Sequence, residues 1–242
     1  MAGVYQVYTI LKNLANKDEQ GFVTPQAFNT FAPMAQQKLV NDLFSKFDTI
    51  NAAARRNSYQ PQDVSLEKRL REDLSFFQKS VKLSRVSGAF ALPSDFMRLI
   101  SVRTSGAFLL NQSTSEPIDV LHEIHKLDDI LSNDMLCPDV CSPLAVMENG
   151  ITLYPNAISN IVIYYYKKPQ GKLATTGAKS AANPRFGYTL TGTKEIYSAA
   201  NSVDFELPVQ YVPDLVAEIA KMIGVSISSA DVYNYAVQEE NK

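Results

Sequence analysis

Apolar residues in the first 85 positions recur at helical spacing. They step by three or four residues from Val4 to Leu14 and predict a first helix, which a polar stretch at 16–21 ends. Thr24 followed by Pro25 is typical of a helix start, because a threonine hydroxyl caps the first turn and proline suits the first helical position. We therefore expect a second helix to begin there.

This second helix is expected to be long and to carry one apolar stripe. The stripe consists of Phe28, Phe31, Ala35, Leu39, Leu43, Phe47 and Ile50. Pro33 lies within it and should kink or split the helix, because proline removes a backbone hydrogen bond and clashes with the preceding turn. A third helix should follow, with Leu66, Leu70, Leu74, Phe77 and Val81 facing inward.

The pattern changes to short strands near Gly88. Leu99–Val102 and Ile161–Tyr166 are runs of apolar, β-branched and aromatic residues bounded by turn-forming residues, which is typical of strands. Asn149-Gly150 predicts a hairpin that involves Ile151–Tyr154. Three further features complete this region: a short helix around Ile124, Leu127 and Ile130, a polar stretch at 170–202 expected to be a long hairpin or mobile loop, and a last strand at Val203–Leu207.

The helical pattern returns after residue 207. Pro213 should begin a helix with Leu215, Ile219, Met222 and Ile223 inward, Gly224 should end it, and a final helix is expected near 229–240. The predicted fold is therefore α+β. It consists of a discontinuous helical bundle at 1–85 and 208–242 and an inserted antiparallel β-rich domain, sandwich or barrel-like, at 86–207.

Composition narrows the class of protein. The chain has 242 residues, is 45% hydrophobic and carries a formal charge of −2, which excludes a disordered chain and a generally basic nucleic-acid binder but not a local basic patch. It contains no apolar run of about 18 residues, and its first residues lack the pattern of a signal peptide. We expect a soluble protein made in the cytoplasm.

Two groups of residues resemble metal sites. Asn16, Asp18 and Gln20 fall at calcium-loop positions 1, 3 and 5, but position 12, which needs a bidentate glutamate, is Ala27. A helical corner is the favoured interpretation. The second group consists of His122, Glu123, His125, Cys137 and Cys141. Its histidines are three residues apart and its cysteines four, which suits neither a zinc-protease helix nor a zinc knuckle. We expect surface histidines and buried thiols.

The chain shows no pattern typical of an enzyme. There is no glycine-rich phosphate loop and no nucleophile elbow. The acidic pairs Asp128-Asp129 and Glu239-Glu240 lie on polar segments, where carboxylates are usually solvated. We therefore predict no catalytic, cofactor-binding or metal-binding residue.

Tyrosine is abundant in the predicted β-rich region. Tyr164-Tyr165-Tyr166 must place aromatic rings on both faces of a strand, because side chains alternate. Tyr154, Phe186, Tyr188 and Tyr197 add to them. Two interpretations stay open: a protein interface, where tyrosine is enriched, or a sandwich core with tyrosines at its rim.

Several stretches resemble virion structural proteins of short-tailed bacteriophages, above all those of crAss-like phages. They are NKDEQGFVTPQAFNTFA (16–32), LPSDFMRLISV (92–102), ITLYP (151–155), IVIYYYKKP (161–169) and ELPVQYVPDLV (206–216). The order of helices, β-domain and returning helix also resembles the tail-tube or adaptor proteins that form a ring under a portal.

The resemblance implies a head-to-tail connector, a ring of commonly twelve copies that docks the portal and neighbouring tail proteins and surrounds the DNA channel used in genome retention and ejection. The helical part would form the contacts between subunits, with 170–202 and the tail from residue 229 as contact arms. The alternatives are another virion role, such as a tail-barrel or fibre-docking component, and a non-viral ligand-binding β-module. No cofactor and no membrane is expected as a partner.

DNA is expected to pass such a ring without sequence-specific binding. Twelve copies would carry 12 × −2 = −24 charges, which repel phosphate. Lys68, Arg69 and Arg71 lie in i,i+4 arrangements with acidic residues such as Glu67 and Glu72, and Lys167-Lys168 end a strand. Arg55-Arg56 is then the one unpaired basic pair near a predicted helix end, where it suits the C-terminal helix dipole as readily as a phosphate. Weak, non-specific DNA affinity is the expected result.

Overall fold

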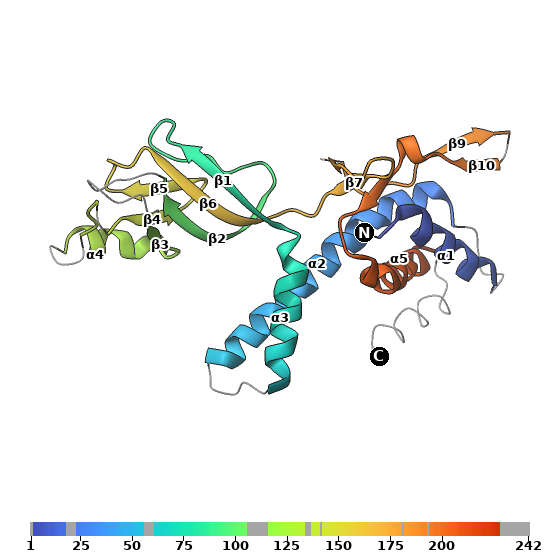
Figure 1. Ribbon diagram of the computed structural model, residues 1–242, viewed down its shortest axis with the longest axis horizontal. Coiled ribbons are helices and arrows are strands. Elements are labelled where there is room, and N and C mark those ends of the chain that lie inside the picture. The colour runs from blue at the N-terminus through green and yellow to red at the C-terminus, as the bar shows by residue number, and fades with distance from the viewer. Residues whose placement is uncertain are drawn as a thin grey trace. The chain divides into compact units, whose positions relative to one another are not determined.

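A computed structural model describes residues 2–17, 23–55, 61–105, 116–133, 137–140, 142–180, 182–192 and 194–227. The fold is α+β, as predicted. The chain divides into two units, which are treated separately below (Figure 1). The helical unit comprises 1–76 and 169–242, and the sheet unit comprises 77–168, whereas the sequence placed the insertion at 86–207.

In its described residues, the helical unit combines four helices with short strands. Its helices are α1 (Val4–Lys17), α2 (Pro25–Arg55), α3 (Pro61–Ser75) and α5 (Val212–Ile227). Its strands are β7 (Gly171–Leu173), β8 (Lys179–Ser180), β9 (Tyr188–Thr191), β10 (Lys194–Tyr197) and β11 (Val203–Phe205), and its 3-10 turns are η2 (Ala199–Asn201) and η3 (Val209–Tyr211). Strand β7 pairs with β11 and β8, and β9 pairs with β10.

Local signals place the starts of the first two helices. The Thr24 hydroxyl accepts a hydrogen bond from the Ala27 backbone N–H at 3.1 Å, so Thr24 caps α2 as predicted. Asp204 Oδ1 accepts a hydrogen bond from the Val4 N–H at 2.7 Å and thereby caps α1 from a distant part of the chain. Pro33 does not split α2, which continues for 31 residues because tertiary packing supports it on both sides of the proline.

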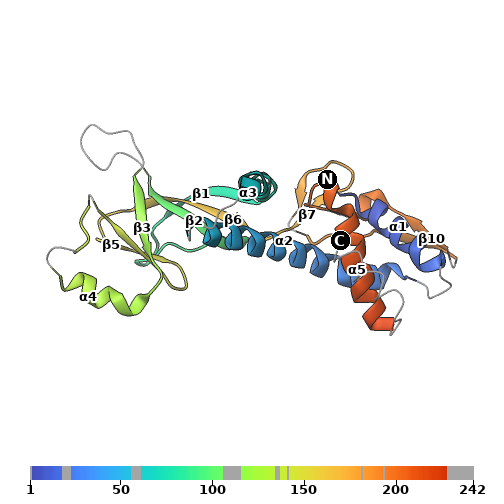
Figure 2. The ribbon, with the colours of Figure 1, turned by 90° about the horizontal axis from the view of Figure 1, so that it is seen from below.

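Helix α2 is the element on which the helical unit is assembled. Helices α1 and α5 lie beside its N-terminal part and α3 beside its C-terminal part (Figures 1 and 2). Lys38 Nζ contacts a Glu218 carboxylate oxygen of α5 at 2.7 Å, and the Arg71 guanidinium of α3 lies 5.5 Å from the centre of the Phe47 ring. Different partners therefore cover different lengths of one helix.

The buried surface of α2 is wider than the predicted stripe. Phe28, Ala35, Leu43 and Ile50 are buried as expected, but Phe31, Leu39 and Phe47 are only half-buried. A second row of α2 residues is also buried, and each of them directly follows a residue of the predicted stripe: Ala32, Gln36, Val40 and Phe44. Elements on more than one side of α2 bury both rows, which a single-stripe pattern does not anticipate.

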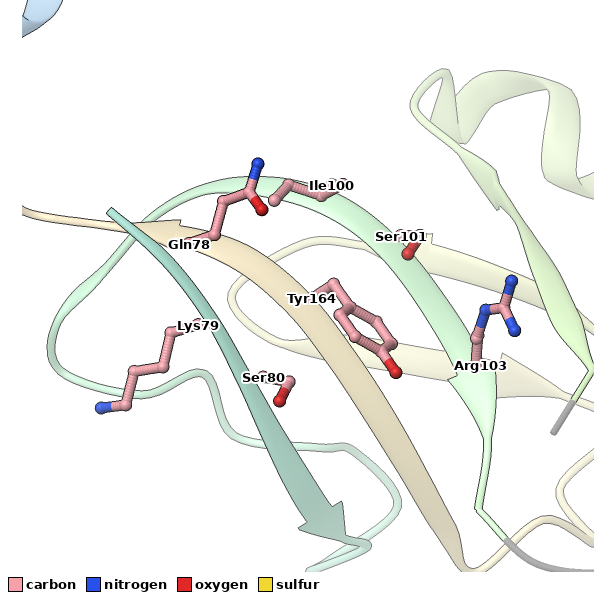
Figure 3. A pocket seen from close by; sticks show the side chains of 7 residues that line it. All are labelled: Gln78, Lys79, Ser80, Ile100, Ser101, Arg103 and Tyr164. Carbon is pink, nitrogen blue, oxygen red and sulfur yellow. The ribbon is translucent and has the colours of Figure 1, made fainter. Parts of the chain in front are cut away.

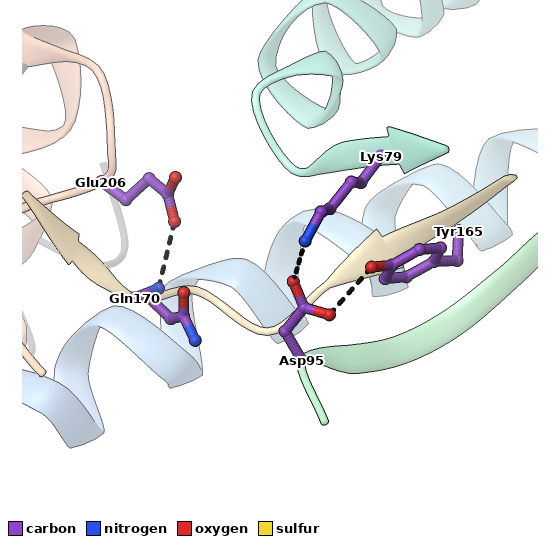
Figure 4. Close-up of polar contacts among 5 residues, drawn as sticks. All are labelled: Lys79, Asp95, Tyr165, Gln170 and Glu206. Atoms are coloured by element: carbon purple, nitrogen blue, oxygen red, sulfur yellow. Dashed lines mark hydrogen bonds and ion pairs between the residues drawn. The ribbon is translucent and has the colours of Figure 1, made fainter. Parts of the chain in front are cut away.

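A buried polar junction fixes the point at which the chain returns to the helical unit. Gln36 of α2, 1% exposed, donates from Nε2 to the Gln170 carbonyl at 2.9 Å and accepts at Oε1 from the Glu206 N–H at 2.9 Å. Glu206 Oε2 in turn accepts from the Gln170 N–H at 3.1 Å (Figure 4). One glutamine side chain thus joins two segments that are 36 residues apart in sequence.

Helix α3 ends earlier than its apolar pattern indicates. Leu70 and Leu74 are buried as predicted, but Leu66 is exposed and the helix stops at Ser75. Val81, expected on the same helix, lies on strand β1 (Gln78–Ser84), because that segment pairs along its whole length with β6 (Asn160–Lys167). Strand pairing with a distant segment overrides the helical spacing here.

The sheet unit is built on a six-stranded sheet in the order β1-β6-β2-β3-β4-β5. Its other elements are β2 (Phe96–Thr104), β3 (Pro117–Leu121), η1 (Ile124–Lys126), α4 (Leu127–Leu131), β4 (Leu144–Met147) and β5 (Ile151–Tyr154). The predicted hairpin is confirmed, since β4 and β5 pair antiparallel across residues 148–150. The fully antiparallel prediction is wrong, because β3 and β4 run parallel after a connection that contains α4.

The core of the sheet unit lies on the concave side of this curled sheet. Ile161, Ile163 and Tyr165 of β6 are fully buried there, together with Val102 and Leu153. Phe90 bridges to Ile151 of β5 by two backbone hydrogen bonds, which draws the segment after β1 toward the other end of the sheet. Gly150 is required beside this bridge, since a Cβ there would lie 2.8 Å from the Phe90 carbonyl oxygen.

The last described helix agrees with its prediction except at its end. Leu215, Ile219 and Ile223 of α5 are buried. Gly224 does not end the helix, which continues to Ile227 with Gly224 buried inside it. The final helix predicted at 229–240 lies outside the described residues.

Replacing Gln36 by alanine should destabilise the helical unit. The change leaves the Gln170 carbonyl and the Glu206 N–H without their buried partner, and we expect a loss of about 2–4 kcal/mol in the free energy of unfolding. Chemical denaturation followed by circular dichroism at the helical band measures it.

The control is the adjacent Gln37, whose side chain bonds Asn41 on the exposed side of α2. Gln37→Ala should change the free energy of unfolding by less than about 0.5 kcal/mol. Equal effects of the two substitutions would contradict the role given to the buried junction.

Candidate assembly surfaces

The sequence-predicted metal candidates are not brought together in the described part of the chain. Residues 18–22 of the calcium-like loop, and Cys141, lie outside the described residues. His122, just before η1, and His125, within it, are both exposed, as predicted, and His125 Nε2 lies 3.8 Å from Glu123 Oε2. Cys137 is exposed, so the expectation of a buried thiol is wrong for this residue, whose loop position leaves it uncovered. Across the described ranges, no group of three or more His, Cys, Asp and Glu residues could hold a metal ion.

The acidic and basic pairs also have defined places. Asp128 and Asp129 are both exposed on α4, in agreement with the solvated interpretation. Glu67 and Arg71 form the predicted i,i+4 pair on α3, with 2.8 Å between Oε1 and Nε. Glu239-Glu240, Arg56 and the side chain of Arg55 lie outside the described residues.

The tyrosines divide between two environments. Tyr164 is 40% exposed while Tyr165 is fully buried, which confirms that the Tyr164-Tyr165-Tyr166 run places rings on both faces of β6. Phe186, Tyr188 and Tyr197 belong to the helical unit instead. The Phe186 ring is buried 4.2 Å from the Tyr8 ring, so the 170–202 segment is anchored by an aromatic contact that its polar composition does not suggest.

The outward face of strands β1, β6 and β2 forms a surface that we call the tyrosine face. Ser80, Tyr164 and Ser101 lie side by side across the three strands. Because both neighbours of Tyr164 are small, its ring stands over a shallow hollow of about 570 Å³ (Figure 3). The hollow is lined by Gln78, Lys79, Ser80, Ile100, Ser101, Arg103 and Tyr164. The bulge at Ile100 turns this apolar side chain toward the same hollow.

The tyrosine face is positively charged. Its three strands contain five basic residues and no acidic one, and the strand register places three of them, Lys82, Arg98 and Arg103, on the same face as Tyr164. The other two, Lys79 and Lys167, alternate to the side of Tyr165. By the strand register, Lys82 and Arg103 flank Val162 in the row next to Tyr164, and Arg98 lies beside Tyr166. Sequence reasoning missed this surface because its members come from three separate segments; the lack of any carboxylate in those segments was the available signal.

An ion pair supports one margin of the tyrosine face. Asp95 accepts hydrogen bonds from Lys79 Nζ at 2.7 Å and from the Tyr165 hydroxyl at 2.8 Å (Figure 4). Burial acts to raise the pKa of Asp95, but the hydrogen bonds from Lys79 and Tyr165 outweigh it and hold this pKa below its usual value. The charge of Lys79 is therefore largely used within the sheet unit.

A second candidate surface is the β9–β10 hairpin of the helical unit. One side of it packs on α1, where Tyr197 lies 4.6 Å from Tyr5 and Glu195 accepts a hydrogen bond from the Tyr8 hydroxyl at 3.4 Å. Leu190 and Ile196 nevertheless remain 66% and 45% exposed. The two strands pair only with each other among the described strands, so both outer edges of the hairpin are open.

No helix in the described ranges is long and apolar enough to span a membrane.

Comparisons with known proteins identify no relative: no protein-family model matches the chain, and the search of curated proteins gives no significant match.

The Asp95 contacts predict an acid-dependent loss of stability in the sheet unit. A carboxylate whose folded pKa lies below its unfolded value of 3.8 stabilises the fold above that pH, and this stabilisation is lost as the pH falls through the lowered folded pKa. We expect the unfolding free energy of the sheet unit to decline below about pH 4, with a smaller decline in Asp95→Asn, in denaturant titrations at a series of pH values.

Glu148→Gln is the matched control, since Glu148 is exposed in the β4–β5 turn. It should leave the pH dependence as in the unchanged protein. An identical acid profile for Asp95→Asn and the unchanged protein would show that Asp95 contributes no pH-dependent stability.

Proposed function

We propose that the chain is a non-enzymatic virion structural protein that forms an oligomeric ring in the neck or tail of a short-tailed bacteriophage. In this role it connects the portal to the tail and surrounds the channel through which the genome passes. The proposal combines the resemblance noted in the sequence with the surfaces described above. Its localisation would be the virion, after synthesis in the host cytoplasm.

The observation that carries the proposal is the β9–β10 hairpin. A two-stranded hairpin with open edges is marginally stable in water, and exposed strand edges readily pair with another chain. Leu190 and Ile196 add exposed apolar area to the hairpin, one on each of its two faces. Such a hairpin, held to α1 at its base, suits a contact between neighbouring subunits better than it suits a free surface.

The division of the chain also supports an assembly role. Hydrogen bonds between distant segments hold the helical unit together. Asp204 accepts one from the first turn of α1, and Gln36 makes others at the polar junction. A unit that is internally satisfied in this way can present the hairpin to a neighbour without rearranging its core. In the proposed function the partners are a second copy and the adjoining virion proteins.

A direct test is the mass of the purified protein. A twelve-membered ring of 26.8 kDa chains has a mass of about 320 kDa, and we expect native mass spectrometry to show a closed species close to this value. A protein that remains at 26.8 kDa at high concentration would contradict the ring and favour a monomeric binding module.

Introducing charge on the hairpin should weaken assembly. Leu190→Asp combined with Ile196→Asp places one carboxylate on each face of the hairpin, so that either face is charged in the proposed contact. We expect the oligomer to dissociate at concentrations at least about tenfold higher than for the unchanged protein. Light scattering coupled to size exclusion measures this shift.

Val86→Asp provides the control, because Val86 is also strongly exposed but lies outside the hairpin and outside the strands of the tyrosine face. It should leave the dissociation unchanged. If the hairpin variant assembled as well as the Val86 variant, the hairpin would not be the contact.

The proposed conduit should bind DNA weakly. The assembled charge is negative, and tight binding requires several phosphate contacts by Lys and Arg, each of which adds to the salt dependence. A DNA titration from low to physiological salt should give weak affinity with no sequence preference. Tight binding with a steep salt slope, lost in Arg55→Ala/Arg56→Ala, would instead indicate a protein that grips DNA.

A further inference from the structure

The basic and the acidic residues of the sheet unit lie in different regions, and the charges of these two regions are opposite. The charged residues that the strand register places on the tyrosine face are all basic: Lys82, Arg98 and Arg103. The segment 116–148, which contains β3, η1, α4 and β4, holds Lys126 as its one basic residue against eight acidic residues in the sequence. Six of these are exposed in the described part of the segment: Asp119, Glu123, Asp128, Asp129, Asp139 and Glu148.

The two charged regions occupy different parts of one sheet. Strands β1, β6 and β2 stand at one end of the strand order and β3, β4 and β5 at the other. Helix α4 lies at the end of the unit where β3, β4 and β5 gather, away from the start of β1 (Figures 1 and 2). Asp128 and Asp129, exposed on α4, are thus available to another molecule, whereas Glu123 is engaged with Lys126 of its own chain.

We propose that the tyrosine face of one copy binds the acidic α4 region of a second copy. This inference rests on the ring function proposed above and specifies one contact between its subunits. Lys82 and Arg103 would face Asp128 and Asp129, and the hollow beside Tyr164 would receive an apolar side chain of the same α4 region. Ile124 and Leu131 are exposed there and have the required character. Tyrosine supplies apolar area together with a hydroxyl, which suits a mixed contact of this kind.

The observations favour a second copy over nucleic acid as the occupant of the tyrosine face. Of the five basic residues in its three strands, Lys79 and Lys167 lie on the Tyr165 side, where Lys79 pairs with Asp95 and Lys167 is buried. The cations on the face itself, Lys82, Arg98 and Arg103, are fewer than the roughly 6–10 phosphate contacts of a tight DNA-binding protein. Tyr164 and Tyr166 share this face along β6, but the neighbours of Tyr164 on β1 and β2 are serines, so the aromatic surface does not extend across the strands as a stacking platform for a longer single strand would.

A contact between two different surfaces is heterologous. Each copy then offers one surface forward and the other backward, which is the arrangement that closes into rings when the rotation allows it. Opposite charges at such a contact also set the orientation of neighbours, because like-charged surfaces repel when a subunit is reversed. The contact is separate from the β9–β10 hairpin, which belongs to the helical unit.

The test exploits this asymmetry with two charge-reversed full-length proteins. The face variant is Lys82→Glu/Arg103→Glu, and the α4 variant is Asp128→Lys/Asp129→Lys; all four side chains are exposed, and circular dichroism verifies that each variant is folded. Alone, each variant should need at least about tenfold more protein to assemble at physiological salt. Mixed in equal amounts they should assemble again, since the reversed surfaces then complement each other in alternation. Lys68→Glu/Arg69→Glu on α3 carries the same charge change as the face variant and should assemble normally.

The outcomes separate this inference from the ring itself. An unchanged protein that stays monomeric overturns the proposed function and this contact with it. An unchanged protein that assembles, with variants that also assemble alone, overturns only the contact. Two weakened variants whose mixture is not restored overturn it as well. Loss of binding to single-stranded DNA in the face variant, with normal assembly, would make the tyrosine face a nucleic-acid surface and overturn the proposal.

Discussion

The helical unit depends on a buried amide. Gln36 on α2 satisfies a backbone carbonyl at Gln170 and a backbone N–H at Glu206, and the Glu206 carboxylate returns a bond to Gln170. Buried polar groups are costly unless they are paired, so these three bonds are made together or not at all. The chain leaves this unit for 92 residues, from Phe77 to Lys168, and the junction defines where it must re-enter. The position of this junction sets where the strands that follow it, including the β9–β10 hairpin, begin.

The sheet unit follows a different rule, which is the alternation of side chains along β6. The same run of three tyrosines closes the core with Tyr165 and faces solvent with Tyr164. The neighbouring strands then decide what surrounds the exposed ring: small serines beside it and basic side chains in the adjoining row. Core and surface are thus specified by one strand, while the chemistry of the surface comes from its partners.

The two contacts proposed between copies, one in each unit, differ in their physical basis. The hairpin offers open strand edges and apolar side chains, which favour association but discriminate little between partners. The tyrosine face offers charge, which contributes less affinity but fixes orientation. An assembly that uses both contacts would gain affinity from the hairpin and a defined subunit orientation from the tyrosine face.

The sequence by itself determined the elements whose signals are local. The Thr24 cap, the Asn149-Gly150 hairpin, the α+β class and the alternation at Tyr164–Tyr166 all follow from neighbouring residues, because capping, turn geometry and side-chain period act over a few positions. Only the tertiary structure decided that 77–84 is a strand, that β3 and β4 run parallel, that Gln36 is buried and that Ser80, Tyr164 and Arg103 share one face. Each of these depends on a partner that is distant in sequence, and the free energy of pairing with it outweighs what the local pattern prefers.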